Sequence, residues 1–237
     1  MSKFFGKSSS ELAKSKYDLV KDTYSTSSEN QITLSPLFSQ TLRNDPKWIG
    51  FTFARHKFIS KMFNQMDRLL EVGCWEGVAS LLIAKSCNQL VVIDYYKPHV
   101  EWANKNIAPI ASNIMFLGHD ILDAPIEIGT FDGAFSLDIL EHIDPEQEKL
   151  YMSNICKCLN DDGAFILGTP SLEAQQYAGL GSKLTHINCK TSEQLKELSL
   201  RFYKNVFMFG MNDEVLHTGF SPMCQYLFAL CTGPKVR

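Results

Sequence analysis

Residues 70–77 (LEVGCWEG) decide the fold, because a short apolar strand runs there into a turn with two glycines. A second apolar segment, residues 89–94 (QLVVID), ends in Asp94. Glycine is favoured where backbone turns beside a ligand, since it lacks a Cβ and reaches positive φ. An acidic side chain at the tip of the next strand can accept hydrogen bonds from both hydroxyls of a ribose. The two segments together predict a site for an adenosine-containing ligand at the carboxyl ends of parallel strands.

Short apolar strands alternate with helical segments through the middle of the chain. This pattern predicts an α/β, Rossmann-like, mostly parallel sheet with helices on both faces. The last two strands have no second long helix between them, so we expect a C-terminal antiparallel pair and seven strands in all. The expected strands are 69–72, 89–94, 114–117, 131–137, 164–167, 206–209 and 225–231, and the expected helices include 53–66, 77–86 and 98–107.

The domain organisation is predicted as an N-terminal arm with accessory helices over 1–52 and one catalytic domain over 53–237. Two helix starts are well marked. Asp144 and Pro145 have the residue types of an N-cap and a first helical position. Thr191 and Gln194 form a capping-box pattern.

Composition argues against three classes of protein: nucleic-acid-binding, disulfide-rich and membrane-associated. The chain has 237 residues and a net charge of -3, which argues against nucleic acid as a partner. Its seven cysteines are an odd number without a regular framework, which is typical of reduced thiols in the cytoplasm. The sequence shows neither a signal peptide nor a membrane-spanning run, so we expect no membrane association.

The glycine spacing bears on the identity of the ligand. A dinucleotide fingerprint reads G-x-G-x-x-G, whereas here Trp75 stands between Gly73 and Gly77. The bulk of Trp75 would crowd a pyrophosphate, which argues against a nicotinamide cofactor. The alternative to a ligand-binding turn is a glycine-rich turn that only packs the strand against the helix.

Several segments together resemble the motifs of class I S-adenosylmethionine-dependent methyltransferases, in the same order. They are LLEVGCWEG, VVIDYYKPHVEWA, FLGHDIL, FDGAFSLDILEHI and LNDDGAFILGTP, within residues 53–232. The resemblance implies S-adenosyl-L-methionine as the cofactor. It also implies these cofactor-binding residues: Arg55, Glu71, Gly73, Cys74, Gly77, Asp94, Tyr95, Asp120, Ile121 and Leu137.

The same resemblance implies individual roles. Glu71 and the two glycines would shape the methionine pocket, and Asp94 would hold the ribose. Arg55 would face the cofactor carboxylate, with a surface arginine as the alternative. Around the adenine it implies Tyr95 beside the ring, and Asp120 and the backbone of Ile121 at the amino group. It also implies that Leu137 lines the cofactor.

Two histidines are candidates for the base that removes a proton from the acceptor. His186 ends the long segment 169–190, which has the length of a lid; a hinge is the alternative. His217 lies in the polar stretch 211–218, which could recognise a hydroxylated acceptor or be a solvated turn.

The run from Asp138 to His142 resembles one that binds a divalent ion in ubiquinone-biosynthesis O-methyltransferases. Helical spacing would put Asp138, Glu141 and His142 on one face. Similar runs occur in metal-free relatives, and we expect no metal here.

The function predicted from these features is methyl transfer to an oxygen, less readily a nitrogen, of a small polar acceptor. The segments HINCKTSEQLKEL and MNDEVLHTGFSPM are similar to uncharacterised bacterial methyltransferases associated with surface sugars, which suggests a saccharide. The alternatives are a non-catalytic binding module that keeps the cofactor fold and a nicotinamide-dependent oxidoreductase.

Overall fold

The structure, a computed structural model, describes residues 8–20 and 32–235. The chain divides between Thr33 and Leu34 into two compact units. The first unit contains α1 (Ser9–Val20), where Glu11 accepts a hydrogen bond of 2.8 Å from the N–H of Ser8. Helix α3 (Lys47–Met62) spans the predicted boundary at 52/53 and belongs wholly to the second unit.

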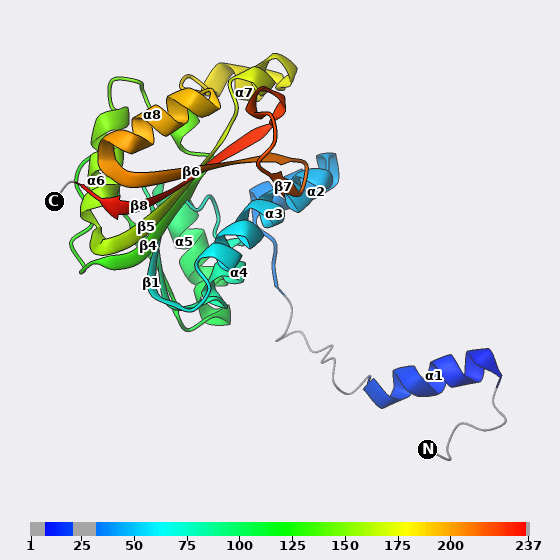
Figure 1. The fold of residues 1–237 in the computed structure, drawn as a ribbon. Coiled ribbons are helices and arrows are strands. Elements are labelled where there is room, and N and C mark those ends of the chain that lie inside the picture. The colour runs from blue at the N-terminus through cyan, green and yellow to red at the C-terminus, as the bar shows by residue number, and fades with distance from the viewer. Residues whose placement is uncertain (1–7, 21–31, 236–237) are drawn as a thin grey trace. The chain divides into compact units, whose positions relative to one another are not determined.

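The second unit is built on one sheet with the strand order β3-β2-β1-β4-β5-β8-β6-β7 (Figure 1). Strands β1 to β5 are parallel, and β8 pairs antiparallel with both β5 and β6. The strands are β1 (Met66–Val72), β2 (Cys87–Asp94), β3 (Ile114–Gly118), β4 (Phe131–Leu137), β5 (Leu159–Pro170), β6 (Tyr203–Asn212), β7 (Val215–His217) and β8 (Tyr226–Pro234).

The helices and short 3-10 turns connect these strands. The α-helices of this unit, besides α3, are α2 (Pro36–Asn44), α4 (Ser80–Ala84), α5 (Lys97–Asn106), α6 (Glu148–Lys157), α7 (Leu180–Thr185) and α8 (Ser192–Phe202). The 3-10 turns are η4 (Ala108–Ile110), η5 (Leu140–His142), η6 (Glu173–Tyr177) and η7 (Ser221–Met223).

The predicted Rossmann-like fold with its antiparallel C-terminal pair is confirmed. The described residues give eight strands instead of the predicted seven, because β6 and β7 form a hairpin at the edge of the sheet. Three predicted helix starts are wrong. Helix α3 begins at Lys47 and not at residue 53. Helix α4 begins at Ser80 and not at Gly77, and α6 begins at Glu148, since Asp144 caps only a turn through the N–H of Glu146.

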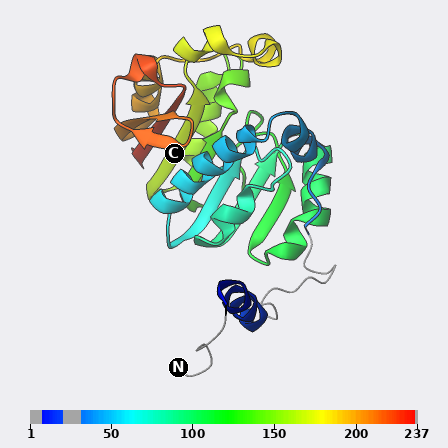
Figure 2. The ribbon, with the colours of Figure 1, turned by 90° about the vertical axis from the view of Figure 1, so that its right-hand side faces the viewer.

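Two apolar layers cover the sheet, one on each face. Leu70 on β1 packs with the buried side chains of α6 and α8. Leu69, which points to the other face, packs with those of α3, α4 and α5. Figure 2 shows α3 lying across this second face. The alternation along β1 follows from the two-residue period of a strand.

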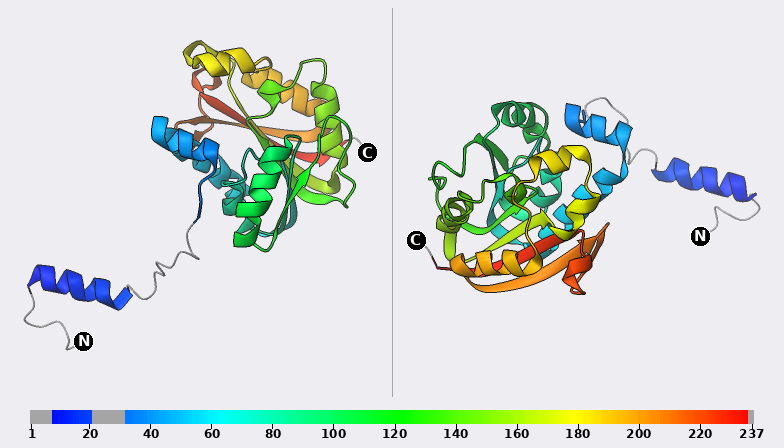
Figure 3. Two further views of the ribbon diagram at one scale, coloured as in Figure 1. Left: turned by 180° about the vertical axis from the view of Figure 1, so that it is seen from behind. Right: turned by 90° about the horizontal axis from the view of Figure 1, so that it is seen from above.

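The connectivity creates a switch point between β1 and β4, which are neighbours although β2 and β3 separate them in sequence. Chains leaving adjacent strands in opposite directions open a crevice at their carboxyl ends, where ligands bind in open α/β sheets. Figure 3 shows the segment that contains α7, in yellow, passing over one end of the sheet. Within the described residues, no helix is both long and apolar enough to cross a membrane.

Candidate functional site

The turn that follows β1 is shaped by three residues with left-handed backbone. Gly73, Trp75 and Gly77 have φ of +79°, +55° and +72°. A Cβ on Gly73 would lie 2.2 Å from Cδ1 of Ile139, so the turn packs tightly against the chain leaving β4. The Trp75 ring is directed to α2, where it lies 6.2 Å from the Phe38 ring. The short α4 begins only after this turn, so the turn itself, and not a helix end, lines the crevice.

Asp94 joins the carboxyl ends of β1 and β2. Its side chain is 8% exposed and accepts backbone hydrogen bonds from Cys74 (3.2 Å) and Tyr96 (2.9 Å). Nδ1 of His99 lies 3.7 Å from Oδ2 of Asp94. Burial, together with the charges of Glu71 and Asp94, raises the pKa of the Cys74 thiol. Cys74 therefore donates its backbone N–H to Asp94 and places an uncharged thiol at the site.

Glu71 carries a buried carboxylate, one oxygen of which accepts no hydrogen bond from the described residues. The residue is 2% exposed, and its Oε1 lies 3.5 Å from Nε2 of His56. Oε2 has no hydrogen-bond partner among the described residues. A buried carboxylate oxygen without a donor is costly, so Glu71 is suited to accept a hydrogen bond from a ligand.

The remaining predicted cofactor residues follow the same edge of the sheet. Leu137 ends β4 and is buried, and Ile121 is buried with its carbonyl accepting from Asn154 Nδ2 (2.8 Å). Asp120 accepts from the N–H of Leu122 (2.9 Å) through Oδ1, which leaves Oδ2 for another donor. Tyr95, directly after β2, is 74% exposed and free to cover a ligand.

Arg55 lies in α3, and its guanidinium binds Asp138. Nη1 lies 2.9 and 2.8 Å from the two carboxylate oxygens, and the guanidinium carbon lies 3.9 Å from the centre of the Tyr226 ring. Burial is the largest single influence and lowers the pKa of Arg55, but the charge and hydrogen bonds of Asp138, together with the charges of Tyr226 and Glu141, outweigh burial, so this pKa lies above its ordinary value. The alternative of a surface arginine is wrong, because the side chain is only 13% exposed.

The run from Asp138 to His142 is not a helix, which corrects the expectation of three side chains on one face. Asp138 has φ +58° and turns to Arg55, and only the 3-10 turn η5 follows. Glu141 is fully buried, and its Oε2 accepts from Oγ1 of Thr169 (3.0 Å). Burial, followed by the charge of Asp138, raises the pKa of Glu141 to about 8.

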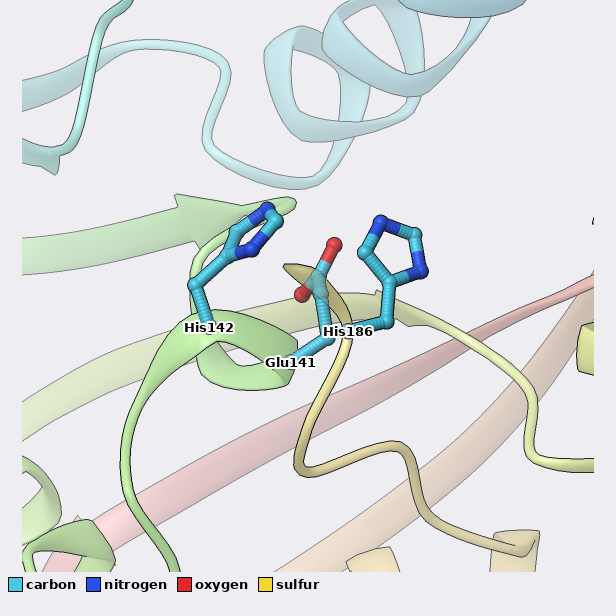
Figure 4. Close-up of side chains that lie close together, drawn as sticks. All are labelled: Glu141, His142 and His186. Atoms are coloured by element: carbon cyan, nitrogen blue, oxygen red, sulfur yellow. The ribbon is translucent and has the colours of Figure 1, made fainter. Parts of the chain in front are cut away.

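His186 lies beside this run, although the sequence separates the two. It caps the C-terminal end of α7, and its ring centre is 5.0 Å from that of His142. Ligand atoms of Glu141, His142 and His186 all lie within 4.8 Å of one another (Figure 4). Burial, followed by the neighbouring His142, lowers the pKa of His186, so its ring is neutral at pH 7.

His217, the other candidate base, lies on β7, the outermost strand. Its Nδ1 accepts from the N–H of Gly219 (3.1 Å), and its buried Nε2 has no hydrogen-bond partner among the described residues. The ring that approaches His186 is that of His142.

Glu76 is a contributor that sequence reasoning missed. Its carboxylate is buried and lies 3.4 Å from the N–H groups of Leu37 and Phe38, in the first turn of α2. Ser35 caps the same helix, and Pro36 is its first residue. The Ser-Pro pair was the signal that could have predicted α2.

Known proteins share sequence features or the fold with this chain. Residues 69–163 match the family model described as "Methyltransferase domain". The fold is similar to that of the N-methyltransferase NodS from Bradyrhizobium japonicum WM9 in complex with S-adenosyl-L-homocysteine, at 20% identity and a TM-score of 0.62 over 84% of this chain and 97% of that one.

Two further solved structures are similar over much of the chain. A TehB-like SAM-dependent methyltransferase from Corynebacterium glutamicum ATCC 13032 Kitasato has 15% identity and a TM-score of 0.55, over 95% of this chain and 98% of that one. An O-methyltransferase family protein from Burkholderia thailandensis has 12% identity and a TM-score of 0.59, over 75% of this chain and 55% of that one. At these identities the likeness shows a shared fold.

Proposed function

Because residues 69–163 form a methyltransferase domain of the class I, S-adenosylmethionine-dependent type, we propose that this protein methylates an oxygen of a small polar acceptor. The observation that carries the proposal is the pair of buried carboxylates at the carboxyl ends of β1 and β2. Asp94 and Glu71 end adjacent strands, and Glu71 retains an oxygen with no partner in the described chain.

The residues present fit the cofactor. Asp94 would accept hydrogen bonds from the ribose hydroxyls, and Oε2 of Glu71 from the amino group of the methionine part. Gly73 has a positive φ and no Cβ, so the turn would let the backbone approach the ligand closely. The cofactor supplies a sulfonium-bound methyl group, and the chain binds it and excludes water.

Oxygen is favoured as the acceptor atom by the polar cluster beyond β4. A hydroxyl must lose its proton as it is methylated, whereas a neutral amine attacks with its own lone pair. The neutral ring of His186, beside His142 and Glu141, provides proton acceptors there. His217, with a buried and unpartnered Nε2, is the second candidate base. A saccharide fits this chemistry because it offers several hydroxyls.

Cys74, Cys87, Cys158, Cys189, Cys224 and Cys231 are free thiols, which supports a reducing compartment such as the cytoplasm. The NodS and Burkholderia structures are named for nitrogen and oxygen methylation respectively, so fold likeness alone does not choose between the two atoms.

Calorimetry with S-adenosylhomocysteine tests the cofactor part of the proposal. We expect Asp94→Asn to weaken binding by about 1–3 kcal/mol, because charge-assisted hydrogen bonds to the ribose are lost. Glu101→Gln, an exposed carboxylate on α5, is the matched control and should bind as the wild type does. Binding of NADH in place of S-adenosylhomocysteine would point to an oxidoreductase. Binding without turnover on any sugar, phenol or amine would point to a binding module.

A further inference from the structure

Three metal-ligating side chains converge from two segments at the end of β4. Glu141 and His142 belong to η5, and His186 ends α7 in the segment that follows β5. Their ligand atoms all lie within 4.8 Å of one another. Figure 4 shows the carboxylate of Glu141 between the two imidazole rings.

Glu141 provides an independent sign that a ligand is missing from this cluster. The residue is 0% exposed, and its Oε1 has no hydrogen-bond partner among the described residues, whereas Oε2 accepts from Thr169. An unpaired oxygen of a buried carboxylate is unfavourable unless a cation or donor satisfies it. Neither of the two histidine rings beside it donates a hydrogen bond to Oε1.

The histidines are already oriented as metal ligands usually are. Nδ1 of His142 faces the carbonyl oxygen of Thr185 (3.0 Å), and Nδ1 of His186 faces Oε1 of Gln175 (3.0 Å). Both partners can only accept, so each Nδ1 carries the hydrogen and each Nε2 keeps its lone pair. Support of one ring nitrogen by an oxygen acceptor is the common outer-shell arrangement of metal-bound histidine.

We propose that Glu141, His142 and His186 bind a divalent transition-metal ion through two imidazole nitrogens and one carboxylate oxygen. This donor set suits ions such as Zn²⁺, Mn²⁺ or Fe²⁺ and leaves coordination positions open. Ligands of one ion lie about 3 Å apart, so small rotations of the side chains close the site. Asp138 is not a ligand in this proposal, because Arg55 already holds both of its oxygens.

The role of the ion rests on the proposed function. An acceptor hydroxyl would occupy an open position, where the cation makes the hydroxyl more acidic. With its ring nitrogen bound to the ion, His186 no longer serves as the base, so the O–H bond breaks and the proton passes to solvent, while the oxygen forms a bond to the methyl carbon. The bond between that carbon and the cofactor sulfur breaks, leaving S-adenosylhomocysteine as a neutral thioether. This departs from the expectation of a metal-free run, because the sequence does not reveal that His186 lies beside His142.

Calorimetry of the full chain, dialysed against a chelator, tests the site with Mn²⁺ and Zn²⁺ as probes. We expect the wild type to bind one equivalent of ion. His186→Ala and His142→Ala should each weaken binding at least about tenfold. His217→Ala is the matched control and should bind the ion as the wild type does. Since Glu141→Gln alters a fully buried residue, the two histidine variants decide the outcome, and circular dichroism confirms that they fold.

The same samples are titrated with S-adenosylhomocysteine, which separates this inference from the proposed function. No binding of either ion by the wild type, or equal binding by both histidine variants, would overturn the metal site while cofactor binding leaves the function standing. Ion binding without cofactor binding would overturn the function alone.

Discussion

The guanidinium of Arg55 and the carboxylate of Asp138 form an ion pair in which Nη1 lies 2.9 and 2.8 Å from the two oxygens. This pair ties α3 to the chain that leaves β4, at the edge of the sheet where the crevice opens. It also fixes an aspartate in left-handed backbone, with φ +58°.

Asp138→Asn should lower the free energy of unfolding by about 2 kcal/mol, because the change leaves the mostly buried Arg55 without a counter-charge. Asparagine tolerates left-handed backbone, so the substitution tests charge rather than strain. Urea denaturation followed by circular dichroism measures the effect. The exposed pair of Lys47 and Asp45 (3.0 Å) is the control, and Asp45→Asn should change stability by less than about 0.5 kcal/mol. Equal losses in the two variants would contradict the importance of the buried pair.

Gly77→Ala should destabilise the chain by about 2 kcal/mol or more. The glycine has φ +72°, and a Cβ there would lie 2.5 Å from Cε1 of Phe116. Thermal unfolding checks the prediction. Gly118→Ala serves as the matched variant, since a Cβ at Gly118 meets nothing within 4 Å and no left-handed φ is involved. A wild-type melting temperature for Gly77→Ala would show that the turn is not constrained as described.

Stability should fall as the pH rises above about 10, where tyrosines of the unfolded chain ionise. Burial raises the pKa of Tyr151 and of Tyr203, so the folded chain keeps protons that the unfolded chain releases. Urea midpoints measured from about pH 8 to about pH 11, on either side of the tyrosine pKa, test this sign.

Two substitutions identify the source of that pH dependence. Tyr151→Phe should flatten the slope and cost about 1 kcal/mol at neutral pH, because the hydroxyl lies 2.6 Å from Oγ of Ser136 in the core. Tyr177→Phe should leave the slope unchanged, since Tyr177 is 84% exposed. A slope that Tyr151→Phe does not alter would assign the effect to other groups.

Thr191→Ala should cost about 1 kcal/mol of stability by removing the capping box of α8. The Thr191 side chain accepts from the N–H of Gln194 (3.2 Å), and the Gln194 side chain accepts from the N–H of Thr191 (3.0 Å). Chemical denaturation provides the measurement. Lys196→Ala, an exposed position of the same helix, should have little effect, and an equal loss at both positions would argue against a specific cap.

The parallel strands and the helices between them could be predicted from the sequence because these strands are short apolar runs. The hairpin strand β7 could not, since two of its three residues are exposed and its burial shows no alternation. The start of α4 was misplaced because Trp75 and Gly77 extend the turn with left-handed backbone, which the residue types alone do not reveal.

The candidate site was predictable only in part, because some of its side chains have partners in distant segments. Glu71 and Asp94 follow from local sequence, because the ends of adjacent strands β1 and β2 meet. The partners of Asp138 and His142 depend on distant segments, α3 and the end of α7, whose docking is set by tertiary packing. Local spacing therefore suggested a helix face where the chain forms a 3-10 turn.

The hydrogen bonds from α2 to Glu76 have a practical consequence for anyone who shortens this chain. A fragment that starts at α3 would retain the whole sheet yet deprive the buried Glu76 carboxylate of the N–H groups of Leu37 and Phe38. A shortened chain should therefore keep Ser35 and all that follows it. The turn from Gly73 to Gly77 packs through Trp75 on α2, which lies outside residues 69–163.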